Sequence, residues 1–179
     1  MTRFSTKTTT ILLAAALCAG VAIGGLMKSR RTATCVDPAG ATCSSCRNSS
    51  TAKFCDTSYI APKASGDIKV NGNKGCCGFE DPKLRASCEA ILQCIRTTGC
   101  GVGNDPSPCL CGDVPPAVCS RNLKPPTGKC KDVYAAALAG GPPGTVIKLF
   151  GDVTSPIGVA NNTFTCDVDS SCACGQPKK

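Results

Sequence analysis

The fold of this chain is decided by residues 81–100, which read DPKLRASCEAILQCIRTTGC. Asp81 is a favoured N-cap residue, and Pro82 suits the first position of a helix. Gly99 is typical of a helix end, because it adopts the left-handed conformation without strain. The stretch therefore predicts a helix from Asp81 to Thr98, whose apolar face we expect to be buried against a second helix. That face consists of Leu84, Cys88, Ile91, Leu92 and Ile95.

The same stretch contributes three of the chain's 17 cysteines. Cys88 lies on the apolar face, Cys94 near its edge and Cys100 just beyond the helix end, so bridges can leave in different directions. Only Cys18 falls within the apolar N-terminal segment, and an even number of cysteines follows it. Such density is typical of oxidising compartments, and we expect full pairing into about eight disulfides. The expected partners are Cys35, Cys43, Cys46, Cys55, Cys76, Cys77, Cys88, Cys94, Cys100, Cys109, Cys111, Cys119, Cys130, Cys166, Cys172 and Cys174.

The chain contains no histidine. Its absence removes Ser–His and Cys–His nucleophile activation, the usual haem-attachment motif and every metal site that includes imidazole. We therefore expect a protein that is not an enzyme, with no catalytic, cofactor-binding or metal-binding residues and no cofactor.

Aromatic residues make up only 4% of the 179 residues, and there is no Trp. Because aromatic side chains supply much of the apolar area of ordinary cores, this core must rely on aliphatic side chains and half-cystines. The formal net charge is +8, but the basic residues are scattered and are not interleaved with aromatics. This pattern argues against a nucleic-acid partner.

The N-terminal residues have the pattern of an export signal. Two basic residues precede an apolar run at 11–27 that is rich in Ala and Gly, as in secretory signals. We therefore divide the chain into a signal peptide or uncleaved signal anchor at 1–27, a polar tether at 28–34 and a single disulfide-rich domain at 35–175. Lipid attachment at Cys18 is disfavoured, because a bulky leucine precedes it.

Within the domain, residues 35–80 carry many turn signals and predict a loop-rich lobe, with a candidate short strand at 67–70. Residues 81–175 predict a helical lobe, in which 101–128 is loop. The expected fold class is small and disulfide-rich, mostly α and irregular, with two or three short helices stapled by about eight disulfides. The further helical segments are Lys129–Ala139, a turn at 146–150, and a short helix that opens at Ser155 and runs to about Asn161.

Several cysteine spacings could carry chemistry. Cys43-x-x-Cys46 has the spacing of redox motifs, but no strand–helix pattern flanks it, which favours a structural role. We expect the close pairs 76/77, 109/111 and 172/174 each to tie two distant segments. The alternative is thiolate ligation of zinc or an iron–sulfur cluster. The first candidate ligands would be Cys109, Cys111, Cys172 and Cys174.

Acidic residues are few, and most sit where caps and turns use them. Asp167-Val-Asp169 could contribute to a Ca²⁺ site, although such a site needs six or more oxygen ligands. A secreted hydrolase that uses carboxylates alone is a weaker, third interpretation. The carboxylates available for it include Glu80, Asp81, Glu89, Asp105, Asp113, Asp132, Asp152, Asp167 and Asp169.

Two stretches carry a family resemblance. Residues 88–100 read CEAILQCIRTTGC and are followed by CLCG at 109–112, while residues 149–162 read LFGDVTSPIGVANN and are followed by Cys166-Asp167. Together they resemble predicted exported cysteine-rich proteins of the myxobacterial type, over roughly residues 76–174. That group has no established activity. The resemblance implies bacterial export and a disulfide scaffold, and it transfers no function.

These observations predict an exported, disulfide-stabilised structural or binding protein of the cell envelope or the extracellular space. The alternative is a thiolate-ligated metal or electron-transfer protein. We expect secretion or outer-envelope attachment, with membrane anchoring as the alternative. The sequence identifies no partner; an envelope surface or another exported protein fits the cationic charge.

Overall fold

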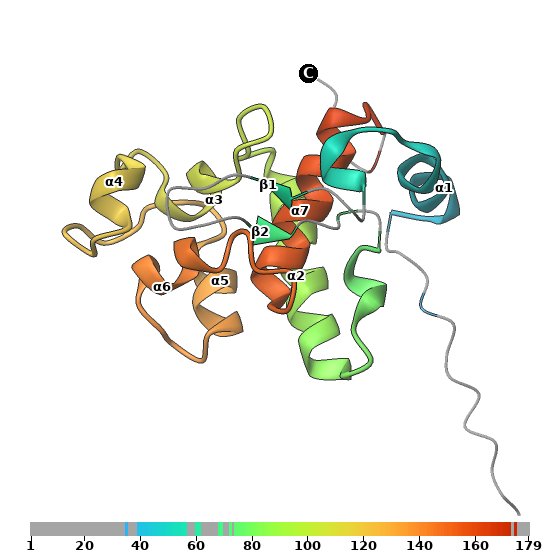
Figure 1. The fold of residues 1–179 in the computed structure, drawn as a ribbon. Helices are drawn as coiled ribbons and strands as arrows, with labels where there is room; N and C mark the ends of the chain where they lie inside the picture. The colour runs from blue at the N-terminus through green and yellow to red at the C-terminus, as the bar shows by residue number, and fades with distance from the viewer. Residues whose placement is uncertain are drawn as a thin grey trace, which may run out of the picture. The chain divides into compact units, whose positions relative to one another are not determined.

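The computed structural model describes residues 35, 39–56, 60–61, 68–69, 72, 74–172 and 174 (Figure 1). All of them belong to one compact unit, Thr34–Lys179. The predicted signal segment and the tether at 28–34 lie outside the described residues. Within the described part, no helix has the length and apolar character that crossing a membrane requires.

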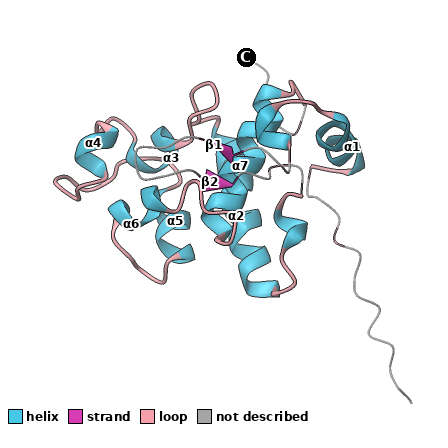
Figure 2. Ribbon diagram, viewed as in Figure 1, coloured by secondary structure: helices cyan, strands magenta, loops and turns pink. Residues whose placement is uncertain are grey.

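Helices are the main regular structure of the described residues, and one two-stranded antiparallel sheet accompanies them (Figure 2). The small, disulfide-rich, mostly helical class is confirmed, although the described residues contain more helices than the expected two or three. The α-helices are α1 (Ala41–Ser49), α2 (Pro82–Thr98), α3 (Ser107–Cys111), α4 (Pro116–Cys119), α5 (Lys131–Ala137), α6 (Pro143–Lys148) and α7 (Pro156–Asp169). The remaining elements are the 3-10 turns η1 (Lys53–Cys55) and η2 (Cys76–Gly78) and the strands β1 (Ile60–Ala61) and β2 (Ile68–Lys69).

Helix α2 forms where its sequence predicts. Asp81 Oδ1 accepts hydrogen bonds from the backbone N–H groups of Lys83, at 2.7 Å, and Leu84, at 3.3 Å. At the other end Gly99 has a φ of 57°, and its N–H donates to the carbonyl of Ile95. The predicted apolar face is buried except at Leu84, which is 39% exposed. That expectation was wrong at this residue, which lies in the first turn of the helix.

Helix α7 is the most deeply buried element. Ser155 caps it by accepting a hydrogen bond from the N–H of Gly158 at 3.0 Å, and every residue from Pro156 to Asp167 is buried. The expected end near Asn161 was wrong, because the helix continues to Asp169. A helix that is covered on all sides has no solvent-exposed face. Its sequence therefore lacks the alternation of apolar and polar faces from which the length of a helix is estimated. Tertiary packing here overrides the modest helix propensity of Asn and Thr.

The apolar core lies where α2, α5 and α7 meet. We expected the apolar face of α2 to pack on the helix at 129–139. Helix α2 does contact that helix, α5, but it packs mainly on α7. The expected helix at 129–139 is the shorter α5. We call the buried cluster of residues from these helices and from α3 and α6 the apolar core. Its centre includes Cys88, Ile91, Ile95, Leu110, Tyr134, Val146 and Ile157.

A polar contact lies inside this apolar core. Tyr134 Oη donates to Oδ1 of Asn161 at 2.7 Å, which joins α5 to α7. Burial raises the pKa of Tyr134, against the opposing effect of its hydrogen bond to Asn161. The Tyr134 ring also stacks on Phe150, with ring centroids 5.6 Å apart. Tyr134 is therefore held by both an apolar and a polar neighbour.

Three short helices lie in stretches that we expected to be loop. Helix α1 occupies part of the predicted loop-rich lobe at 35–80, while α3 and α4 occupy part of 101–128. Helix α1 has no apolar face to signal it, and α3 and α4 are single turns with proline near their starts. The turn expected at 146–150 lies earlier, as α6. The candidate strand at 67–70 contains β2, in which Ile68 pairs with Ala61.

Candidate functional site

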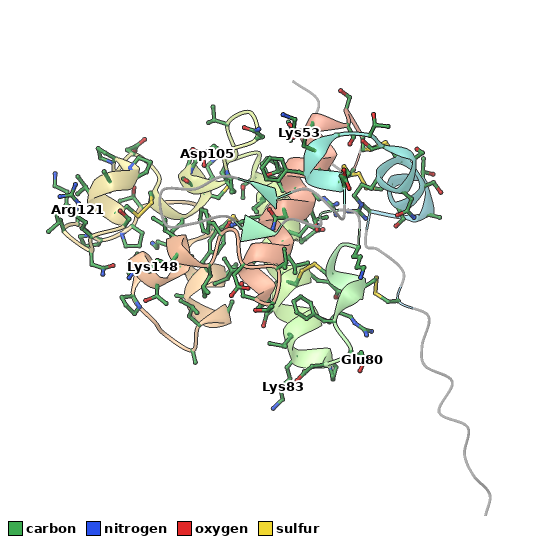
Figure 3. All side chains as sticks on the ribbon, viewed as in Figure 1. Lys53, Glu80, Lys83, Asp105, Arg121 and Lys148 are labelled. Carbon is green, nitrogen blue, oxygen red and sulfur yellow. A yellow bond between two sulfur atoms is a disulfide. The ribbon has the colours of Figure 1, made fainter. Side chains whose placement is uncertain are left out.

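The structure pairs all sixteen cysteines beyond the N-terminal segment into eight disulfides (Figure 3). The bridges span from 8 to 131 residues of sequence, so they tie both adjacent turns and the two ends of the domain. The pairs are Cys35–Cys77, Cys43–Cys174, Cys46–Cys172, Cys55–Cys166, Cys76–Cys88, Cys94–Cys130, Cys100–Cys109 and Cys111–Cys119.

Neighbouring cysteines bond to different partners. Cys76 bonds to Cys88 in α2, whereas Cys77 bonds to Cys35. The four residues that the sequence suggests first as metal ligands are likewise divided among four bridges, two at α3 and two in the C-terminal tail. The structure therefore does not gather those residues into one site.

The Cys43-x-x-Cys46 motif lies on α1, and both of its cysteines bond to the C-terminal tail. Cys43 pairs with Cys174 and Cys46 with Cys172. We call these four residues, with Ala39 packed against them, the sulfur core. A redox motif of this spacing would bond internally when oxidised. The observed pairing instead supports the structural interpretation of the motif.

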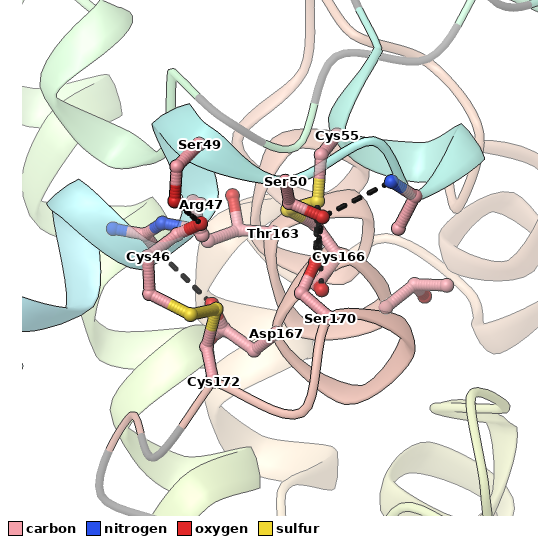
Figure 4. The surroundings of a disulfide bond; sticks show 12 residues. Cys46, Arg47, Ser49, Ser50, Cys55, Thr163, Cys166, Asp167, Ser170 and Cys172 are labelled. Carbon is pink, nitrogen blue, oxygen red and sulfur yellow. Dashed lines mark hydrogen bonds and ion pairs between the residues drawn. A yellow bond between two sulfur atoms is a disulfide. The ribbon is translucent and has the colours of Figure 1, made fainter.

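Asp167 lies between two buried arginines beside the sulfur core. Its Oδ2 accepts a hydrogen bond from Nη2 of Arg96 at 2.7 Å. Its Oδ1 lies 3.4 Å from Nη1 of Arg47 (Figure 4). These residues come from α7, α2 and α1, and each is at most 3% exposed. A buried ion group becomes strongly destabilising when one partner is lost. We call Arg47, Arg96 and Asp167 the ion triad. It links α1 and α2 to α7.

The ion triad argues against the Ca²⁺ interpretation of Asp167-Val-Asp169. Asp167 is committed to the two arginines, and Asp169 is exposed at the end of α7. Other carboxylates serve local structure: Asp105 Oδ1 accepts from the N–H of Ser107 at 2.8 Å, before α3. In the part of the chain that the structure describes, no cluster of three close metal-ligand atoms consists of carboxylates alone.

An apolar pocket of about 370 Å³ opens between α3, α5 and α6. Pro125, Pro126 and Pro143 line it together with the buried side chains of Leu110 and Val146. Its volume lies within the range of small-molecule sites, which are mostly apolar with a few polar groups. Proline rings are stiff, so these walls need little ordering when a ligand binds.

The polar groups of the apolar pocket come from the first turn of α5. Lys131 and Asp132 line it, and Ala135 follows one turn later. Exposed charges elsewhere on the surface, such as Arg121 and Lys148, point outward (Figure 3). The pocket thus combines apolar walls with an ammonium and a carboxylate group.

A second pocket, of about 450 Å³, lies beside the Cys46–Cys172 bridge and is lined mainly by hydroxyl groups. Ser50 Oγ lies 2.5 Å from Oγ of Ser170, which is 3.0 Å from Sγ of Cys55 (Figure 4). A serine nucleophile needs an adjacent base. The lining offers a single carboxylate, Asp169, and no lysine. We assign no chemistry to this pocket.

No family model, curated protein or solved structure matches this chain. The features that define its candidate sites are therefore those of its own residues.

Sequence reasoning missed both the apolar pocket and the ion triad. The two double-proline turns, 125–126 and 142–143, were a weak sequence signal for the pocket. All of these prolines except Pro142 line the pocket. The ion triad had none, because Arg47 and Arg96 lie 120 and 71 positions from Asp167 in sequence.

Proposed function

We propose that this chain is an exported, non-enzymatic binding protein of the cell envelope or the extracellular space, stabilised by its disulfides. The complete pairing of the cysteines of the domain carries the proposal, because such bridges form and persist in oxidising compartments and are rare in the cytosol. Pairing also competes with thiolate ligation of a metal, which makes the alternative metal or electron-transfer function less favoured. The resemblance to exported cysteine-rich proteins points the same way.

The first test measures thiols and location together. The full chain is expressed in a bacterial host, cells are fractionated, and the protein is alkylated under denaturing, non-reducing conditions before its intact mass is measured. We expect protein outside the cytoplasm with no alkylated cysteine in residues 35–174. Several alkylated thiols in exported protein would overturn the proposal, and stoichiometric zinc or iron would favour the alternative. N-terminal sequencing of the same sample distinguishes signal cleavage from a retained anchor.

The apolar pocket favours a binding role over a purely structural one. A small organic molecule with an apolar body fits its proline, leucine and valine walls. An anionic group on that molecule would be attracted by the ammonium of Lys131 and by the positive net charge of the chain, against the opposing effect of the single carboxylate of Asp132. We therefore propose a small apolar anion as the ligand class, which 8-anilinonaphthalene-1-sulfonate represents as a fluorescent probe.

The second test fills the pocket. Ala135 lines it, and its neighbour Ala136 is exposed and does not. An Ala135→Trp variant places an indole where the probe would lie, so we expect at least a tenfold loss of probe affinity. Ala136→Trp is the matched control and keeps the affinity of the unmodified protein. Equal affinity for all three proteins, with unchanged thermal melts, would show that the pocket does not bind the probe.

A further inference from the structure

Two disulfides lie in contact at the C-terminal end of α2. Cys94, on that helix, bonds to Cys130, and Cys100, just beyond it, bonds to Cys109 of α3. The Sγ atoms of Cys100 and Cys130 belong to different bridges and lie only 3.6 Å apart. The Sγ atoms of Cys100, Cys109 and Cys130 all lie within 4.8 Å of one another. Four sulfurs therefore form one cluster in which a second pairing is within reach.

The cluster is held in place by the backbone on both sides. The N–H of Cys130 donates to the carbonyl of Cys109 at 2.9 Å, which brings the start of α5 against α3. Gly128 fits closely in the same place, since a Cβ there would lie 2.3 Å from the carbonyl oxygen of Cys109. The contact between the two bridges is thus built by the same packing that joins these helices.

We propose that this cluster is a thiol-exchange site, at which attack by a small external thiol on Cys94 converts the Cys100–Cys109 bridge into Cys100–Cys130. In the first step the external thiolate forms a bond to Sγ of Cys94. The Cys94–Cys130 bond breaks, and its electron pair leaves on Sγ of Cys130. In the second step this thiolate attacks Sγ of Cys100 and releases Cys109 as a thiolate, which takes up a proton. One thiol is consumed and one is formed, so no oxidant is needed.

Access to the sulfurs sets the direction of the first step. Exchange depends on which sulfur a thiol can reach. Cys94 is half-buried, whereas Cys109 and Cys130 are fully buried at 0% exposure. Within the Cys94–Cys130 bridge an external thiol therefore meets Cys94 first, and the buried Cys130 becomes the leaving group. The Cys130 thiolate is shielded from solvent, so it attacks a neighbouring sulfur. Sγ of Cys100, 3.6 Å away, is the target of that attack.

Thr98 supplies a donor for the intermediate. Its Oγ1 donates to the carbonyl of Cys94 at 2.7 Å and lies 3.7 Å from Sγ of Cys130. A hydroxyl that rotates toward Cys130 can stabilise the thiolate formed in the first step. After the exchange, Cys109 is a buried free thiol, Cys100 is bonded to Cys130, and Cys94 carries the external thiol.

The test is disulfide mapping after limited exposure to glutathione. The oxidised full chain is treated with a small excess of glutathione, quenched with acid, alkylated and digested with trypsin. Trypsin releases Cys130 within the dipeptide 130–131, which is bridged to peptide 86–96 in the native pairing. After exchange the dipeptide is bridged to peptide 97–121, which contains Cys100. Cleavage before Asp105 then separates Cys100 from Cys109 and locates the bond.

We expect glutathione on Cys94, alkylation of Cys109, and more than half of the modified protein carrying the dipeptide on peptide 97–121. Alkylated Cys130 with an intact Cys100–Cys109 bridge would overturn the second step. Glutathione at other cysteines, with Cys94 untouched, would overturn the first.

A variant tests the second step without an external thiol. Cys94→Ser leaves Cys130 without its partner, and we expect it to bond to Cys100 and to leave Cys109 as the main alkylated residue. The matched control is Cys119→Ser, whose former partner Cys111 belongs to neither three-ligand cluster. Cys111 should remain the alkylated residue there. If Cys130 is the alkylated residue of folded Cys94→Ser, the proposal fails; if this variant does not fold, the glutathione experiment decides.

Discussion

The apolar core and the sulfur core differ in what their residues contribute. The apolar core buries aliphatic side chains of α2, α5 and α7, with Tyr134 among them. The sulfur core contains four cysteines and one alanine, and the ion triad lies beside it. One region is stabilised mainly by removing apolar surface from water, and the other by covalent bonds and paired charges.

The difference follows from the segments that each region must hold. Helix α2 has an apolar face that can pack on a neighbour. Helix α1 offers no such face, since its only buried residues are Cys43 and Arg47. A segment without apolar area can be fixed only by specific bonds, which here are two disulfides and an ion pair. Four variants test this division, in order of decreasing expected effect.

The largest effect should come from a charge placed in the apolar core. Ile91 is fully buried, and an Ile91→Asp variant buries a carboxylate without a partner. We expect it to lower the free energy of unfolding by more than about 4 kcal/mol. Gln93→Asp, on the exposed face of the same helix, should change it by less than about 0.5 kcal/mol. Similar denaturant midpoints for the two variants would mean that the wrong face of α2 has been assigned to the core.

The ion triad should be nearly as sensitive. Asp167→Asn keeps the shape of the side chain but removes the negative charge between Arg47 and Arg96. We expect a loss of about 3–5 kcal/mol, because the two buried arginines then lose the negative charge that Asp167 places between them. Asp169→Asn, two positions away and exposed, is the control and should have little effect. A loss below about 1 kcal/mol for Asp167→Asn, measured by chemical denaturation, would show that the ion pairs do not fix α1.

The sulfur core should be less sensitive than its sequence separations suggest. The Cys46–Cys172 bridge spans 126 residues, but Cys43–Cys174 joins the same two segments just outside it and already closes most of that loop. Only three positions on one side and two on the other separate these two bridges. Replacing Cys46 and Cys172 together by serine should therefore cost about 2 kcal/mol, as expected for a loop of about 5 residues.

The matched control for this nesting is the double serine variant at Cys111 and Cys119, whose bridge spans only 8 residues. We expect the two double variants to lose stability within about 1 kcal/mol of each other. A sulfur-core variant that is less stable than the control by about 2 kcal/mol or more would mean that each long bridge acts independently.

The smallest effect concerns the polar contact within the apolar core. Tyr134→Phe keeps the ring against Phe150 but removes the donor to Asn161 Oδ1. We expect a loss of about 1–2 kcal/mol, since the buried amide oxygen is left unpaired. Adding Asn161→Leu removes that unpaired group, so the double variant should be less destabilised than the sum of the single variants. Full additivity in a double-mutant cycle would show that the two groups do not interact.

The sequence indicated α2 closely because its limits depend on local chemistry. A carboxylate cap at Asp81, a glycine at position 99 and a spaced apolar face act within a few residues of each other. The even number of cysteines likewise pointed to a fully bridged domain. Helix α1 had no comparable local signal, and α7 could not be measured by periodicity, because its length is fixed by the neighbours that bury it.

The composition by itself determined a protein without imidazole chemistry, with a core poor in aromatics and a chain built for disulfides. Only the tertiary structure decided which cysteines pair and that Asp167 lies between two arginines. It also decided that four sulfurs, from α2, the residue just beyond its end, α3 and the start of α5, form one cluster. The physical reason is one of range. Caps and periodic faces act over one or two helical turns, whereas bridges and ion pairs depend on how distant segments fold against each other.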